Sequence, residues 1–239
     1  MHSIETRHQF TLEFLEDLLG RQTKQYFTTL IICASKPTFL EQIIPPLLEA
    51  SVEQSDGDNA MRVETLSTDI DAERPETGAS HVSILKPILR SLAAAEKVRL
   101  VFCPTIAVLR GYLSAYNVSE IAPKECPPPS KTQLVVLDVL ALHHGTSEFS
   151  LQGLSRIFAT AVSAAYNNGS DLKLVECKSI HDPTDPNRGS ALWDTDIPLL
   201  NRSIKLGGEG TRWAGRLINV KKVAARWFVF EQQPGEDVE

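Results

Sequence analysis

The stretch Gln133–Leu142 reads Gln-Leu-Val-Val-Leu-Asp-Val-Leu-Ala-Leu, a nearly continuous apolar run broken by one acid, Asp138. Such a run fits a strand in the middle of a mostly parallel sheet, where both faces are buried. Because an ionised carboxylate is costly in that place, Asp138 needs a cation or hydrogen-bond donors. Two roles are open from this stretch alone: holding magnesium near a nucleotide, or capping the loop that follows the strand.

Strand-like and helix-like segments alternate on both sides of this run. Short apolar or β-branched runs predict further strands at 26–34, 98–103 and 172–177. Helical spacing of apolar residues predicts helices at 8–19, 37–50, 81–95, 104–116 and 150–166, and Pro45 with Pro46 is expected to end or kink the second of these. The alternation predicts an α/β fold: a mostly parallel central sheet with helices on both faces.

The chain divides into a core and several flanking segments. Residues 1–25 are expected to form an N-terminal helix and linker, 26–231 the main domain, and 232–239 a polar tail. Residues 52–80 hold eight acids and two bases, which predicts an acidic, loop-rich insertion. Three short strands at 203–206, 213–220 and 226–231 are expected to form a C-terminal antiparallel meander, its last strand covered on both sides.

Composition limits the class of function. A hydrophobic fraction of 42% and a net charge of −6 fit an ordinary globular domain and argue against wholesale affinity for nucleic acid, although a local basic patch is compatible with them. The four cysteines lack zinc-ribbon or redox spacing, which favours a reducing, intracellular compartment. No window has the apolar length of a membrane span, so neither a span nor secretion is expected.

A family resemblance rests on two stretches. Leu134–His144, with Gly-Leu-Ser-Arg-Ile-Phe at 153–158 after it, resembles the Walker B strand and following helix of the RecA/recombinase family, particularly its divergent recombinase paralogs. Trp-Ala-Gly-Arg at 213–216 and Arg-Trp-Phe at 226–228 are similar to the β-rich end of that core. The resemblance implies a three-layer RecA-like core in which Asp138 occupies a degenerate Walker B position.

The sequence departs from this family at the phosphate-binding loop. A P-loop needs a Gly-rich backbone with Lys and Ser or Thr directly after the first strand. The corresponding Cys33–Phe39 reads Cys-Ala-Ser-Lys-Pro-Thr-Phe, and no glycine occurs between Gly20 and Gly57. We therefore expect no nucleotide cofactor and no ATP hydrolysis, and Asp138 then favours the capping role.

The sequence does not favour a metal site or a hydrolase site at this edge. His143, His144, His181 and Cys177 would lie near Asp138 at the carboxyl ends of the strands, but they lack metal-ligand spacing, so no metal site is predicted. Ser147 and Ser150 lie near His144 without a nucleophile-elbow motif, so no catalytic residues are assigned.

Basic residues are the candidates for nucleic-acid binding. Arg188 lies in a turn-rich loop at a position where recombinases carry DNA-contacting loops, as the resemblance implies, and a solvated surface loop is the alternative. A basic cluster near Trp213 and Trp227 could follow a phosphate backbone, or it could keep hairpin edges soluble; its members are Arg202, Lys205, Arg212, Arg216, Lys221, Lys222 and Arg226.

These observations predict a non-catalytic RecA-like subunit of a nuclear recombinational-repair complex, resembling Shu-complex members. It would pair with a second RecA-like subunit and bind single-stranded or forked DNA to assist filament assembly. The alternative is an accessory subunit of Elongator, also RecA-like without an intact P-loop, which would be cytoplasmic and bind transfer RNA. The sequence does not separate these two.

Overall fold

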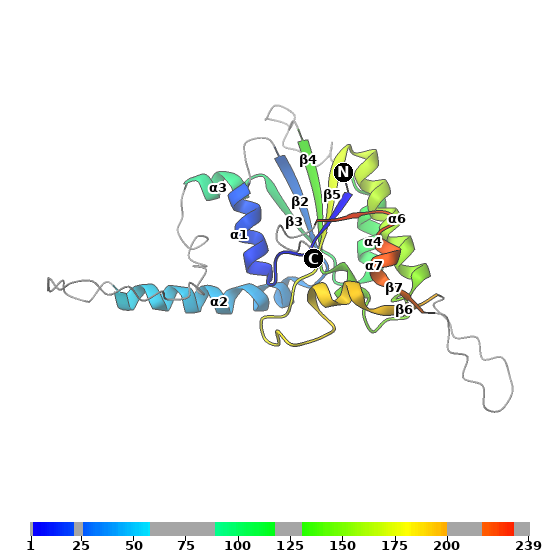
Figure 1. Cartoon of the computed structure of the whole chain (residues 1–239). Helices are drawn as coiled ribbons and strands as arrows, with labels where there is room; N and C mark the ends of the chain where they lie inside the picture. Colours follow the sequence, from blue (N-terminus) through cyan, green and yellow to red (C-terminus); the bar gives the residue numbers. More distant parts are fainter. Residues whose placement is uncertain (1, 22–25, 58–88, 118–130, 200–216, 232–239) are drawn as a thin grey trace, which may run out of the picture.

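The computed structural model describes residues 2–21, 26–57, 89–117, 131–199 and 217–231, and it has an α/β architecture (Figure 1). Six strands form one sheet in the order β3-β2-β4-β5-β1-β8, and every pairing in it is parallel. Their bounds are β1 His2–Glu5, β2 Tyr26–Ile32, β3 Val98–Phe102, β4 Lys131–Leu137, β5 Ser170–Val175 and β8 Val229–Glu231. The predicted parallel sheet is confirmed.

Helices cover both faces of this sheet, as the alternating pattern predicted. One core lies between the sheet and the pair α1 (Thr11–Arg21) and α2 (Lys36–Gly57). The other lies under α4 (Ile106–Ser114), α6 (Leu151–Asn167) and α7 (Val220–Ala224), and Figure 1 shows these helices on the side opposite α1. The three layers are consistent with a RecA-like arrangement.

The central run ends earlier than expected. β4 stops at Leu137, and α5 (Val139–His143) begins directly after Asp138. Asp138 has φ 61°, in the left-handed region that Asp and Asn tolerate better than other non-Gly residues. This one residue turns the chain from strand to helix, so the expected strand to Leu142 was wrong in its second half.

The N-terminal segment contains a strand that the sequence pattern did not predict. β1 lies between β5 and β8, with Ile4 beside Leu174 and Phe230. Four residues are too few to show an alternating pattern, so the sequence does not predict β1. Residues before 26 therefore contribute a strand and α1 to the same sheet and core.

Helix α2 continues past the prolines that were expected to end or kink it. Pro45 and Pro46 both lie inside the helix, which Figure 1 shows as a long rod. Proline φ is close to the helical value, but each proline lacks an N–H for the helix and its ring crowds the carbonyl four residues before it, here that of Glu41 or Gln42. The remaining helices are α3 (Leu89–Ala95) and the 3₁₀ helix η3 (Gly189–Asp194).

The C-terminal region differs from the predicted meander. An antiparallel pair is present, formed by β6 (Asp196–Pro198) and β7 (Leu217–Asn219), and α7 follows β7 directly. β8 joins the main sheet in parallel at its edge, where Phe228 is buried but Val229 is 60% exposed. The last strand is therefore covered on one side only. The expected strand at 203–206 and the acidic insertion from 58 onward lie outside the described residues.

Candidate functional site

The carboxyl ends of β2, β4 and β5 gather the polar residues that parallel sheets commonly use for ligands. Cys33 follows β2, Asp138 follows β4, and Glu176 follows β5. All three are buried, and Cys33 donates its N–H to the carbonyl of Leu137 at 3.0 Å. Asp138 lies at this edge, as its position at the end of the apolar run predicts.

Asp138 joins two distant segments of the chain. Its Oδ1 accepts the N–H of Cys177 at 2.8 Å, and its Oδ2 forms an ion pair with Nη2 of Arg188 at 3.0 Å. Its side chain makes no capping bond to α5. The expected capping role was therefore wrong: this carboxylate holds the end of β5 and the loop that ends at Arg188.

Glu176 performs the capping that was assigned to Asp138. Its two oxygens accept the N–H groups of Leu140 at 2.6 Å and Ala141 at 3.3 Å, in the first turn of α5. Glu176 was not singled out from the sequence. The available signal was a lone acid, Leu-Val-Glu-Cys, inside an apolar run, the same signal that identified Asp138.

Burial dominates the electrostatics of these two carboxyls. Loss of solvent raises the pKa of Glu176 well above its usual 4.5, the nearby Asp138 charge raises it further, and the amides of α5 oppose the change. Burial also raises the pKa of Asp138, against the lowering effect of Arg188. Two acids and one guanidinium are thus packed together in a site of low polarity.

The turn after β2 does not have the form of a phosphate cradle. Ser35 accepts two N–H groups from the first turn of α2. Its Oγ accepts the N–H of Thr38 at 3.3 Å, and its carbonyl oxygen accepts the N–H of Phe39 at 3.0 Å. Pro37 has no N–H to offer. Cys33, just before this turn, is buried, and burial raises the pKa of its thiol well above the usual value.

Arg188, a candidate for nucleic-acid contact, is directed from its loop towards the end of β4. Its guanidinium turns inward to Asp138, its side chain is 25% exposed, and its buried Nε makes no hydrogen bond. Gly189, with φ 77°, allows the close approach to Lys178 that closes the base of the loop, since a Cβ there would lie 2.7 Å from Lys178 Cγ.

The histidines near this edge do not assemble around Asp138. His143 is buried, with Nδ1 at 2.7 Å from the carbonyl of Val139, and burial lowers its pKa. His144 packs edge-on against Phe149, and His181 is exposed in the loop. Ser150 caps α6 by accepting the N–H of Gly153, a structural role.

Part of the predicted basic cluster can be located. Lys221, Lys222 and Arg226 are exposed on α7 and just after it, and Lys221 Nζ lies 5.3 Å from the ring centre of Phe230. Trp227 is half-buried, with its ring packed towards the core under α7. Arg202, Lys205, Arg212 and Arg216 lie outside the described residues, as does Trp213.

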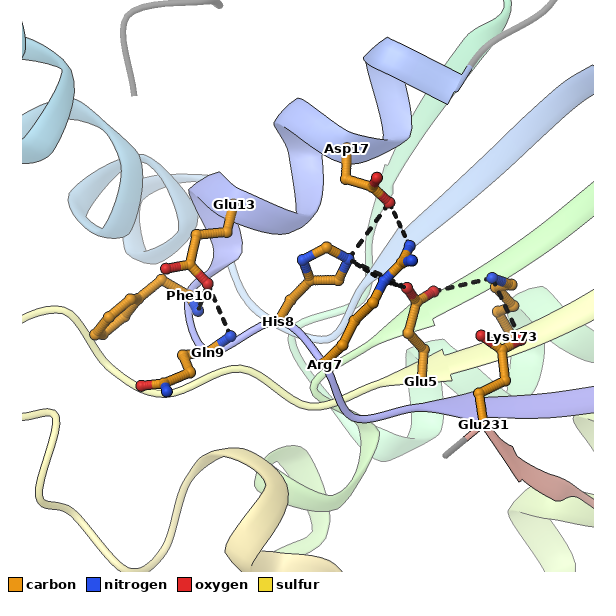
Figure 2. A network of polar contacts seen from close by, with 9 residues as sticks. All are labelled: Glu5, Arg7, His8, Gln9, Phe10, Glu13, Asp17, Lys173 and Glu231. Carbon is orange, nitrogen blue, oxygen red and sulfur yellow. Dashed lines mark hydrogen bonds and ion pairs between the residues drawn. The ribbon is translucent and has the colours of Figure 1, made fainter. Parts of the chain in front are cut away.

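A second polar cluster, which the sequence did not predict, lies at the carboxyl end of β1 (Figure 2). Glu5, Arg7 and His8 come from β1 and the loop after it, Asp17 comes from α1, and Lys173 comes from β5. We call these residues the β1 network. Across the described parts of the chain, Glu5, His8 and Asp17 are the one group of three side chains whose ligand atoms lie close enough to share an ion.

Comparison with known proteins adds no family assignment. A scan against protein-family models finds no match, and a search of curated proteins finds none. Among the described helices, none is both long and apolar enough to cross a membrane.

Proposed function

We propose that this chain is a non-catalytic RecA-like subunit of a DNA recombination and repair complex. The best support is that both acids at the strand ends already have partners within the chain. Asp138 pairs with Arg188 and accepts the Cys177 N–H, and Glu176 accepts two N–H groups of α5. A magnesium nucleotide would need a free carboxylate and a glycine-rich cradle at this edge. A chain of this kind would act by pairing with another subunit and by binding DNA through its basic residues.

An apolar stripe on α2 supports pairing with a second RecA-like subunit. Leu40, Ile44 and Leu48 recur every fourth residue, so they share one face of the helix. They are 37%, 45% and 60% exposed, which places a row of large apolar side chains in solvent. Exposed apolar rows of this kind are typical of protein interfaces.

The exposed basic residues on α7 support the nucleic-acid part of the proposal. Lys221 and Lys222 are adjacent and Arg226 lies one turn later, close enough for their charges to act on one phosphate backbone. Such binding depends on counterion release, so it should weaken steeply as salt increases.

The experiment that tests pairing is affinity capture of the tagged full chain, followed by mass spectrometry. Capture of a recombinase or a recombinase paralog supports the proposal, provided that Ile44→Glu/Leu48→Glu loses it and Glu41→Lys/Glu49→Lys, a control on the same helix, keeps it. Capture of Elongator subunits instead would overturn the repair assignment in favour of transfer-RNA modification. A full chain that hydrolyses ATP, with loss in Lys36→Ala, would overturn the non-catalytic assignment.

The nucleic-acid arm is tested by single-stranded DNA binding at several salt concentrations. Lys221→Glu/Lys222→Glu should weaken binding by at least about tenfold and flatten its salt dependence. Arg99→Glu/Arg110→Glu makes the same change of charge at exposed positions of β3 and α4 and should change binding much less. Equal loss in both variants would mean that only net charge matters.

A further inference from the structure

The β1 network brings three potential metal ligands to one point from three parts of the chain. Glu5 is the last residue of β1, His8 lies in the loop after it, and Asp17 lies in α1 (Figure 2). His8 Nε2 is 3.1 Å from Glu5 Oε1 and 3.4 Å from Asp17 Oδ2, and all three ligand atoms lie within 4.8 Å of one another.

These spacings suit a small ion with nitrogen and oxygen ligands. Bonds of about 2.0–2.2 Å in a tetrahedral zinc site place neighbouring ligand atoms about 3.3–3.6 Å apart. The two separations from His8 Nε2 lie close to that range, and no two of the three atoms are more than 4.8 Å apart. Imidazole together with carboxylates favours zinc and its neighbours over magnesium or calcium.

The position of Arg7 shows independently that the three atoms face a cation. Its Nε contacts Glu5 Oε1 and donates to His8 Nε2 at 2.9 Å, and its Nη2 contacts Asp17 Oδ2. A guanidinium can only donate, so a positive charge already lies against all three candidate ligand atoms.

The surroundings hold the ligands in place. Glu5 is 2% exposed, and Lys173 Nζ binds its other oxygen, Oε2, at 2.9 Å, leaving Oε1 directed to His8. Lys173 is also 3.5 Å from Glu231 on β8. Arg7 is 31% exposed, so its side chain has solvent into which it can move. Arg7 and Lys173 supply two positive charges to the three carboxylates of Glu5, Asp17 and Glu231, so a divalent ion that displaced Arg7 would bring the positive charges to three.

We propose that Glu5, His8 and Asp17 form a binding site for a divalent metal ion of the zinc class, with Arg7 as the competing cation. An ion there would tie α1 to the end of β1 by coordinate bonds in place of an ion pair. The fourth coordination position would be open to water or to a donor from a partner.

The test uses the full chain, stripped with a chelator and titrated with Zn²⁺, with the bound metal measured after dialysis. We expect one ion per chain, loss of that ion in His8→Ala, and retention in His181→Ala, which removes an exposed histidine elsewhere. Arg7→Met should bind Zn²⁺ more tightly than the wild type, because the competing cation is gone. Circular dichroism of the stripped variants shows whether each is folded.

Titration with Co²⁺ identifies the ligand type. A nitrogen–oxygen site gives visible d–d bands without the near-ultraviolet thiolate band that a cysteine site shows. A wild-type chain that binds no ion, binding that survives His8→Ala, or a thiolate band would each overturn the proposal. Arg7→Met binding no more tightly than the wild type would overturn the role given to Arg7.

Discussion

Two charged clusters at the same edge of the sheet differ in the partners of their charged groups and in their exposure to solvent. At the ends of β4 and β5, Asp138 and Glu176 are buried and share one guanidinium, and backbone amides supply the remaining donors. At the end of β1, Glu5 is buried but Asp17, Arg7 and Lys173 reach solvent, and each charge has more than one partner. The first cluster is a fixed structural joint, and the second can exchange partners.

The comparison predicts the largest loss of stability for Arg188→Met. Removing the guanidinium leaves Asp138 charged and buried with only one amide, which should lower the free energy of unfolding by about 2–4 kcal/mol, somewhat less than for a fully buried pair because Arg188 is a quarter exposed. Urea denaturation measures this.

Asp138→Asn provides the matched control for Arg188→Met. Asn tolerates the left-handed backbone and can still accept the Cys177 amide, so the double variant Asp138→Asn/Arg188→Met should recover part of the loss. If the double variant were less stable than Arg188→Met alone, the buried charge would not be the cause.

The next effect is a dependence of stability on pH through Glu176. Its pKa is raised in the folded chain, so folding favours the protonated form: the stabilisation is complete below the unfolded value near 4.5 and is lost as pH rises through the folded value. The urea midpoint should therefore fall over this window in the wild type. Glu176→Gln cannot titrate, and its midpoint should fall less; parallel curves would contradict this account.

A smaller effect is expected for Glu5→Gln, although Glu5 is as buried as Glu176. Gln keeps the shape and one acceptor, and Arg7 and Lys173 retain Asp17 and Glu231 as partners, so the loss should be about 1–2 kcal/mol. The measurement is urea denaturation without added metal. A loss as large as that of Arg188→Met would remove the distinction between the two clusters.

The smallest effect is expected for Asp17→Asn. Asp17 is 27% exposed and pairs with Arg7, which is 31% exposed, so the loss should stay below about 1 kcal/mol and shrink further at high salt. Thermal unfolding at low and high ionic strength tests this. A loss that salt does not change would show that this pair behaves as a buried one.

Local sequence was sufficient for the elements that carry a long periodic signal. The apolar run before Asp138, the helix capped by Ser150 and the strand before Cys177 all lie close to their predicted positions. The one acid inside that apolar run, Asp138, is a residue of the polar site at the strand ends. The sequence was not sufficient for β1, for the end of the central run or for α7, because short elements carry little pattern and their state depends on what they pack against.

The candidate site was less predictable than the fold. Arg188 lies 50 residues from Asp138, and the pattern around it indicated only a surface loop. Asp17 was one of several acids on an amphipathic helix, and nothing local connects it with Glu5 and His8. Of the basic cluster, only Lys221, Lys222 and Arg226 can be located.

By itself, the sequence determined an α/β chain with a buried parallel sheet, helices on both faces and no glycine-rich turn after β2. Those properties follow from residue type and short-range spacing. Only the tertiary structure decided that β1 enters the sheet, that Arg188 meets Asp138, and that Glu5, His8 and Asp17 face one point. These pairings join residues from different elements, and their free energies depend on burial and distance, which spacing along the chain does not encode.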